Sequence, residues 1–453
     1  MPEGINSGDT AWVLAAAALV LFMTPGLAFF YGGFVRNKNV LGTLMQSFIV
    51  MGLVGVAWVV IGYSLAFGPD VEGWGIIGNL DHFGLSGVGP AGDSQAGTGI
   101  PHEAFMIFQA MFAIITPALI TGAFAERAKF GPFLVFMVAW SLLVYAPVAH
   151  WVFDVEGWLL ADVKALDFAG GTAIHVNAGA AALAAAFVFG RRKGYKEEPM
   201  EPHDITMILL GTGILWFGWF GFNAGSAGAA NGVAANAFTV TNTAAAAAAL
   251  TWVGMSWWMS GKPSVVGAAA GAVAGLVAIT PASGYVQPME AIGIGAVAGI
   301  VCFLAVQWRT RTNIDDSLDV VAVHGVGGLW GALATGIFTV AVAGQTLGVD
   351  GLTAGGGLEQ LGRQAVGVAV VAPYSFIVTF AILKALDLTV GIRVNEEDEV
   401  AGLDVSQHGE RAYIFGGSGP VLGIPEAIPV HTELPIAQPA HQAPARQTTG
   451  HAG

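Results

Sequence analysis

Long apolar stretches separated by short polar loops are the main feature of this 453-residue sequence. A helix needs about 20 apolar residues to cross the hydrocarbon core of a bilayer. Eleven stretches have about this length and predict an all-α integral membrane protein, although the region 235–280 can be divided in more than one way. The predicted spans are 11–33, 41–67, 103–125, 131–153, 169–190, 204–225, 235–260, 264–280, 288–308, 322–344 and 365–390.

The basic residues test this pattern, because loops that stay in the cytoplasm are enriched in lysine and arginine. With the N-terminus outside, eleven spans leave only Lys164 and Arg363 outside, and the other 15 of the 17 basic residues lie inside. One span more or fewer would scramble this division, so the charges support eleven spans, an outside N-terminus and a cytoplasmic C-terminus. The inside residues are Arg36, Lys38, Arg127, Lys129, Arg191, Arg192, Lys193, Lys196, Lys262, Arg309, Arg311, Lys384, Arg393, Arg411 and Arg446.

Composition agrees with a membrane protein, since only 11% of the residues are charged and 55% are hydrophobic. Soluble domains carry about 25% charged residues. The 65 glycines fit closely packed membrane helices, and the net charge of −14 argues against nucleic acid as a partner. The single cysteine, Cys302, cannot form a disulfide framework or a thiolate metal site alone. The start "MPEGINSGDTAW" has no basic segment of a signal peptide, so we expect the first apolar stretch to be retained.

The polar segments divide the chain into a transmembrane domain, a cytoplasmic region and a tail. The outer loop 68–102 is glycine-rich and acidic and contains no lysine or arginine. We expect a transmembrane domain over 1–390 and a cytoplasmic C-terminal region of mixed charge over 391–415. Residues 416–453 consist largely of Gly, Pro, Ala and His, which predicts a disordered tail.

Two of the ten histidines, His175 and His324, fall within apolar spans. Each follows an aspartate by eight residues, Asp167 and Asp316, and the two lie on the fifth and tenth spans. Five spans in each half would give two halves of opposite topology plus a final helix, as in transporters built from inverted repeats.

Ionisable residues within spans usually face a bundle interior or a pathway. A neutral imidazole donates from one nitrogen and accepts at the other, so His175 and His324 could line a pore for a small polar solute. They could also relay a proton, since histidine titrates near neutrality. The alternative is a pair of buried histidines that only bond neighbouring helices. Neither pore role requires a metal or covalent chemistry.

Several residues near the predicted outer side are candidates for cation binding. Asp167 precedes the fifth span, where it can cap the helix, attract a cation, or do both. Phe108 and Phe112 are four residues apart, as are Phe222 and Ser226, so each pair shares a helix face. Aromatic rings attract small cations, and the serine hydroxyl could accept a hydrogen bond from one.

Six segments together resemble the ammonium transporters of the Amt/Mep/Rh family, bacterial Amt branch. The resemblance extends in the family's order from residue 25 to residue 413. The segments are "PGLAFFYGGFVRNKNVL", "FQAMFAIITPALITGAFAER", "DFAGGTAIHVNAG", "WFGWFGFNAGSA", "DDSLDVVAVHGVGG" and "GLDVSQHGERAY".

The resemblance implies eleven helices, two inverted five-helix repeats and one pore in each protomer of a homotrimer. It implies that His175 and His324 are twin pore histidines and that Phe112 and Phe222 form an outer phenylalanine gate. It also assigns outer recruitment of ammonium to four residues, which are Phe108, Phe153, Ser226 and Asp167.

Phe153 is a departure from the family pattern. Members usually carry tryptophan three residues after the histidine of this motif, whereas "AHWVF" has phenylalanine, with Trp151 and Trp158 nearby. Two residues are also inserted before "DFAGG". Because phenylalanine is the weaker cation–π partner, weaker outer recruitment or a displaced tryptophan is expected.

The resulting hypothesis is an ammonium transporter of the cell membrane, without enzymatic activity or cofactor. Ammonium would lose its proton outside and cross as ammonia, with or without proton transfer through the histidines. The segment "GLDVSQHGERAY" implies a regulatory region and docking of a PII signalling protein. The alternatives are an ammonium sensor, a neutral gas or solute channel, and a haem protein, although no CxxCH motif is present.

Overall fold

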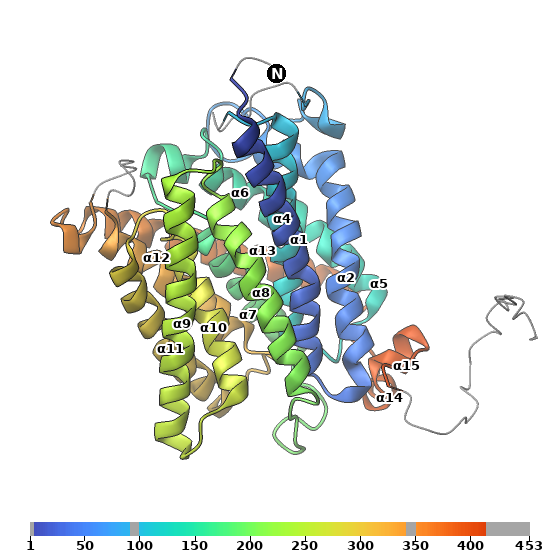
Figure 1. Ribbon diagram of the computed structural model, residues 1–453. Coiled ribbons are helices and arrows are strands. Elements are labelled where there is room, and N and C mark those ends of the chain that lie inside the picture. Colours follow the sequence, from blue (N-terminus) through green and yellow to red (C-terminus); the bar gives the residue numbers. More distant parts are fainter. Residues whose placement is uncertain (1–3, 91–98, 341–349, 414–453) are drawn as a thin grey trace, which may run out of the picture. The chain divides into compact units, whose positions relative to one another are not determined.

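The computed structural model describes residues 4–90, 99–340 and 350–413, and these residues form helices and connecting loops without a named strand (Figure 1). In this part of the chain, ten helical segments have the length and hydropathy of a membrane span. The spans are α1 Ser7–Phe34, Asn37–Phe67 with α2 Val40–Ala57 and α3 Tyr63–Phe67, α4 His102–Phe124, Phe130–Phe153 with α5 Phe130–Trp140 and α6 Ala146–Phe153, Gly171–Phe189 with α7 Asn177–Phe189, α8 Ile205–Gly225, α9 Gly232–Ser260, α11 Pro288–Arg311, Val321–Phe338 with α12 Gly327–Phe338, and α13 Glu359–Thr389.

Each predicted span corresponds to one helical segment, but one of the eleven is short. The predicted range 264–280 forms α10, Val265–Ile279, which has 15 residues. The predicted end of the tenth span also differs, because α12 stops at Phe338 and residues 341–349 lie outside the described part.

Small residues let the helices approach closely. Along the contact of α1 with α8, a Cβ on Gly211 would lie 2.3 Å from the backbone nitrogen of Phe30, which no side chain tolerates. In a membrane, where apolar burial drives association only weakly, such contacts hold helices together by packing. The abundance of glycine is thus explained by close helix contacts rather than by disorder.

Two corresponding segments meet at the centre of the bundle. Each begins with a π-helical turn, Gly171–Val176 before α7 and Val321–Val326 before α12. Near their crossing, a Cβ on Gly179 would lie 2.2 Å from the Cα atom of Gly325. Single π turns inside α-helices often occur at functional sites. This crossing brings the two membrane histidines together.

The C-terminal region forms two short helices, α14 Glu396–Ala401 and α15 Leu403–His408, which pack at one end of α2 (Figure 1). The Asn39 side chain accepts a hydrogen bond from the Leu403 amide at 2.8 Å. The Gly42 amide donates to the Asp404 carboxylate at 2.9 Å. The compact unit extends to Tyr413, and the predicted tail 416–453 lies outside the described residues.

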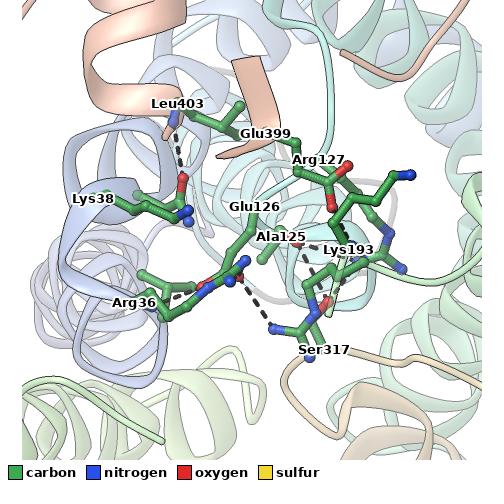
Figure 2. Close-up of polar contacts among 12 residues, drawn as sticks. Arg36, Lys38, Ala125, Glu126, Arg127, Lys193, Ser317, Glu399 and Leu403 are labelled. Carbon is green, nitrogen blue, oxygen red and sulfur yellow. Dashed lines mark hydrogen bonds and ion pairs between the residues drawn. The ribbon is translucent and has the colours of Figure 1, made fainter. Parts of the chain in front are cut away.

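A network of buried charges joins the loops at the same end of the bundle (Figure 2). Glu126 forms ion pairs with Arg36 at 2.7 Å and Arg192 at 3.5 Å, and Arg192 pairs with Asp315 at 2.9 Å. Burial by itself would raise the pKa of Glu126, but Arg192 and Arg36 hold this pKa below its ordinary value. Glu399 joins the C-terminal region to the loop after α7 by accepting from the Lys193 amide at 2.7 Å.

Candidate functional site

His175 and His324 are both buried and form a direct pair. Their Nδ1 atoms lie 3.2 Å apart, and their rings are stacked with centroids 5.3 Å apart and planes 22° apart. One Nδ1 must carry the shared hydrogen and the other must accept it. Neutral imidazole has one donor and one acceptor nitrogen, so the two Nε2 atoms then have opposite roles. The pair therefore presents one acceptor and one donor to a small polar solute.

Aromatic rings continue from this pair in a series. The Phe222 ring stacks 6.2 Å from the His175 ring, and the Phe112 ring lies 4.4 Å from Phe222. Phe108 follows at 4.8 Å from Phe112, with the rings near perpendicular. Phe112 and Phe222 are both almost fully buried.

Two cavities of very different size border the histidine pair. A cavity of about 10 Å³ touches both histidines and is otherwise lined by apolar side chains that include Trp219, Phe222 and Ile115. A second cavity of about 410 Å³ touches His324 and contains Asp319 in its lining. His175 Nε2 is buried and has no hydrogen-bond partner among the described residues. An intact ion would lose its hydration in the narrow part at a large cost, whereas a small neutral molecule would not.

Asp167 is buried beneath the π turn that carries His175 and accepts four backbone hydrogen bonds. The donors are the amides of Gly170, Gly171, Thr172 and Ala173, at 2.7–3.0 Å. Burial raises the pKa of Asp167 above its ordinary value, and these four amides oppose the increase. The capping role expected from the sequence is present, and the carboxylate fixes the helix end on which His175 lies.

Asp316 holds the corresponding place before His324. Its carboxylate accepts from the Val321 amide at 2.7 Å, and its second oxygen is buried without a partner in the described chain. Burial raises the pKa of Asp316 to about 6. The two halves thus share a carboxylate that supports a histidine-bearing turn.

Of the remaining predicted residues, Phe108 and Ser226 lie near the far end of the ring series, and Phe153 lies on α6. The Phe108 ring packs closely against Gly225, so that a Cβ atom added to Gly225 would lie 2.8 Å from Phe108 Cε2. Ser226 follows directly, and its hydroxyl donates to the Phe222 carbonyl at 2.8 Å. Phe153 is partly buried at the end of α6 and packs beside Trp151 and its apolar neighbours. In the described part of the chain, no ring contact joins Phe153 to Phe108.

Comparison with known proteins assigns this arrangement to a family. Residues 11–413 match the model of the Ammonium Transporter Family. The chain belongs to the ammonium transporter family.

Individual relatives match along most of the chain. An ammonium transporter of Bacillus subtilis is 48% identical over 410 residues, with 90% of this chain and 99% of the relative covered. The crystal structure of Candida albicans Mep2 superposes with a TM-score of 0.82 at 38% identity, covering 87% of this chain and 88% of Mep2. A structure described as a sensor Amt protein has a TM-score of 0.79 at 29% identity, covering 88% and 98%.

Trp219 also lies beside the histidine pair, although the sequence alone did not single it out. Its ring stacks on His175 at 5.4 Å, and its indole N–H donates to Thr280 at 2.9 Å. The available signal was the spacing of Trp219 three residues before Phe222, which places both on one face of α8. Within the described residues, no group of three His, Cys, Asp or Glu side chains is arranged to hold a metal ion.

Proposed function

We propose that this chain transports ammonium across the cell membrane as a carrier of ammonia, and that it is not an enzyme. The observation that carries this proposal is the series of buried rings from Phe112 and Phe222 to the hydrogen-bonded pair of His175 and His324. The series offers a dry, narrow path with hydrogen-bonding groups at only one depth. Such a path suits a small neutral solute with donors and an acceptor, as ammonia is.

Selectivity follows from the same geometry. Ammonium and potassium have similar sizes, so a cation pore would separate them poorly. A hydrated potassium ion cannot become neutral, and bringing it into an apolar passage is very costly. Ammonium can release its proton, and only the ammonia crosses.

Recruitment is assigned to the outer end of the ring series. We propose that Phe108, Phe153 and Ser226 receive ammonium there and that Asp167 favours the cation through space. Support comes from the contact of Phe108 with Gly225 and from the Ser226 hydroxyl at the end of α8. Phe112 and Phe222 then act as the gate, and His175 and His324 receive ammonia, with or without a coupled proton.

The proposed topology has eleven spans, with α10 as the eighth, in two inverted sets of five followed by α13. Support comes from the matching π turns before α7 and α12 and from the basic residues on one side. The N-terminus lies outside and the C-terminus in the cytoplasm. We divide the chain into a transmembrane domain 1–390, a cytoplasmic regulatory region 391–415 and a tail 416–453.

Assembly is proposed by analogy with the family. The chain forms a homotrimer in the lipid bilayer, and its C-terminal region provides the docking surface for a PII signalling protein. The packing of α14 and α15 on α2 supports a regulatory position, because these helices contact the loops that end the spans. Pull-down with PII in the presence and absence of ADP tests the partner.

Two other functions fit the same fold. A sensor role is favoured by the likeness to the sensor Amt protein, and a neutral gas channel is favoured by the apolar passage. A sensor would bind ammonium without appreciable flux, whereas a gas channel would conduct carbon dioxide as readily as ammonia.

Uptake into liposomes that contain the purified protein decides between these functions. We expect flux with ammonium and methylammonium but none with potassium. His175→Ala should lower the ammonium flux by roughly 10- to 100-fold, because the buried hydrogen-bonding pair is lost. The control is His203→Ala, a loop histidine whose ring nitrogens contact the Val35 carbonyl and the Tyr413 hydroxyl. Unchanged uptake in His175→Ala would rule out the histidine relay.

A further inference from the structure

A third buried histidine, His150 on α6, lies outside the ring series. It is fully buried and contacts two oxygen atoms. Its Nδ1 lies 3.0 Å from the Ala66 carbonyl oxygen, and its Nε2 lies 3.0 Å from the Asp70 carboxylate. His150 thus connects α6 both to the end of the second span, at Ala66, and to the loop that follows it, at Asp70.

Counting hydrogen-bond donors shows that His150 and Asp70 must share an additional proton. A carbonyl oxygen only accepts, so Nδ1 carries a hydrogen. A neutral imidazole then has a lone pair at Nε2, which would face the carboxylate and repel it. The contact at Nε2 therefore needs a second proton, either on the imidazole or on the carboxyl group.

The surroundings place this proton on His150. Burial alone would raise the pKa of Asp70, but hydrogen bonds from the backbone near Gly75 and from His150 hold that pKa below its ordinary value. The Ile76 amide also donates to the same carboxylate oxygen at 3.0 Å. Asp70 is therefore the anion and His150 the imidazolium.

The other ionisable groups nearby are mostly acidic. Asp154 and Glu156 follow α6, and burial raises the pKa of Asp154 to about 6. In the described residues, no lysine or arginine pairs with Asp70, Asp154 or Glu156. The other ionisable groups on the loop and the packed elements are Tyr63 on α3, Tyr145 just before α6, His175 on Gly171–Val176, Tyr374 on α13, and the exposed Glu72, Asp162 and Lys164.

The loop 68–79 is attached to α6 by further bonds around this pair. The Trp151 indole donates to the Ile76 carbonyl at 2.7 Å, and the Asp70 amide donates to Glu156 at 2.8 Å. The Trp158 amide donates to the Gly75 carbonyl at 3.1 Å. The helix end that these bonds hold carries Phe153.

We propose that His150 is a positioning residue whose proton, shared with Asp70, fastens the loop 68–79 to the helix end that bears Phe153. Without this proton the contact loses a charge-assisted hydrogen bond, and the loop is held less tightly. The consequence for ammonium uptake rests on the proposed transport function, whereas the bound proton and the held loop do not.

Nitrogen NMR of the full chain, labelled with ¹⁵N-histidine in detergent, tests the proton directly. We expect one histidine with both ring nitrogens protonated near neutral pH, and its signal should be missing in His150→Gln. A neutral imidazole at this position would overturn the proposal. Should His150→Gln not fold, Asp70→Asn provides the second test, because its amide can donate to a neutral Nε2. In that variant the imidazolium signal should convert to a neutral one.

Hydrogen exchange of the segment 65–79 tests the fastening. Asp70→Asn replaces the ion pair by a neutral hydrogen bond, so protection of this segment should be roughly tenfold lower than in the wild type. The control His203→Gln should behave as wild type, since neutral imidazole satisfies its carbonyl and hydroxyl partners. Equal protection in the wild type and in Asp70→Asn would contradict the proposal.

Ammonium uptake completes the test. The affinity for ammonium should be weaker in Asp70→Asn than in the wild type. If no variant transports ammonium but the NMR and exchange results hold, the proposed function fails and the positioning role stands.

Discussion

Asp167 positions His175, because its carboxylate accepts hydrogen bonds from the four backbone amides at the start of the helix that carries this histidine. Asp167→Asn keeps the shape but leaves one oxygen instead of two to accept these bonds. We expect a loss of stability of about 1–3 kcal/mol, since buried amides would lose partners. Thermal unfolding in detergent measures this loss, and Asp162→Asn is the control because Asp162 is exposed. Equal melting temperatures for the two variants would contradict the capping role.

Asp316 predicts a dependence of stability on pH. Its pKa is raised by burial from 3.8 to about 6, so the folded chain binds this proton more tightly than the unfolded chain does. The associated stability is present below pH 3.8 and is lost as the pH rises through about 6. The loss is on the order of 3 kcal/mol.

Asp316→Asn tests this dependence, because its amide oxygen can still accept from Val321 but does not titrate. The wild type should lose thermal stability relative to the variant between about pH 4 and about pH 6. Parallel curves for the two proteins over this range would show that Asp316 is not responsible.

At the level of single residues, the sequence predicted that His175 and His324 lie within spans, because apolar stretches are local information. The assignment of Phe112 and Phe222 followed only from the family resemblance, and their role as a gate stays a proposal. It did not reveal Trp219 as a partner of His175, since that contact joins α8 to the turn before α7. The proton shared by His150 and Asp70 was also not predictable. It depends on a carbonyl and a carboxylate that are 84 and 80 residues away in the chain.

Among the helices, the crossing of the two histidine-bearing segments depends on Gly179. A Cβ there would lie 2.2 Å from the Gly325 Cα atom, so Gly179→Ala should push the segments apart. Overpacking of this kind costs about 1–3 kcal/mol, and a longer distance between the histidines should also slow uptake. Thermal unfolding and liposome uptake measure the two effects.

Gly213 on α8 provides the matched control, because a Cβ there would meet nothing within 4 Å. Gly213→Ala should change neither melting temperature nor uptake. If Gly179→Ala is equally silent, the backbone approach does not fix the histidine pair.

Hydrophobic stretches predicted where the spans lie, because crossing a bilayer requires about 20 apolar residues whatever their partners are. They did not predict the π turns at Gly171–Val176 and Val321–Val326, because hydropathy does not distinguish a π turn from an α-helical turn. They also did not indicate that α10 has only 15 residues, since the apolar composition extends beyond its ends.

For the molecule as a whole, the buried charges at one end connect the spans to the C-terminal region. Glu399 is buried and accepts from the partly exposed Arg393 and from the Lys193 amide, so Glu399→Ala removes the carboxylate partner of both. Loss of these hydrogen bonds costs about 1–3 kcal/mol. We expect faster hydrogen exchange over 395–408, and Glu397→Ala, an exposed neighbour, should have no effect. Unchanged exchange in Glu399→Ala would mean that other contacts hold the region.

The sequence predicted a cytoplasmic segment at 391–415 from its charge but did not show which residues it contacts. Those contacts join Glu399 and Leu403 to loops more than 200 residues away. Such pairing is set by the packed bundle rather than by local pattern.

The central claim is that ammonia, and not an intact cation, passes the histidine pair. Flux into liposomes that contain the purified wild-type protein or His175→Ala, with ammonium or potassium outside, tests it most directly. The account predicts ammonium flux in the wild type, a loss of roughly 10- to 100-fold in His175→Ala, and no potassium flux in either protein. Potassium flux through the wild type at a rate near that of ammonium would contradict it.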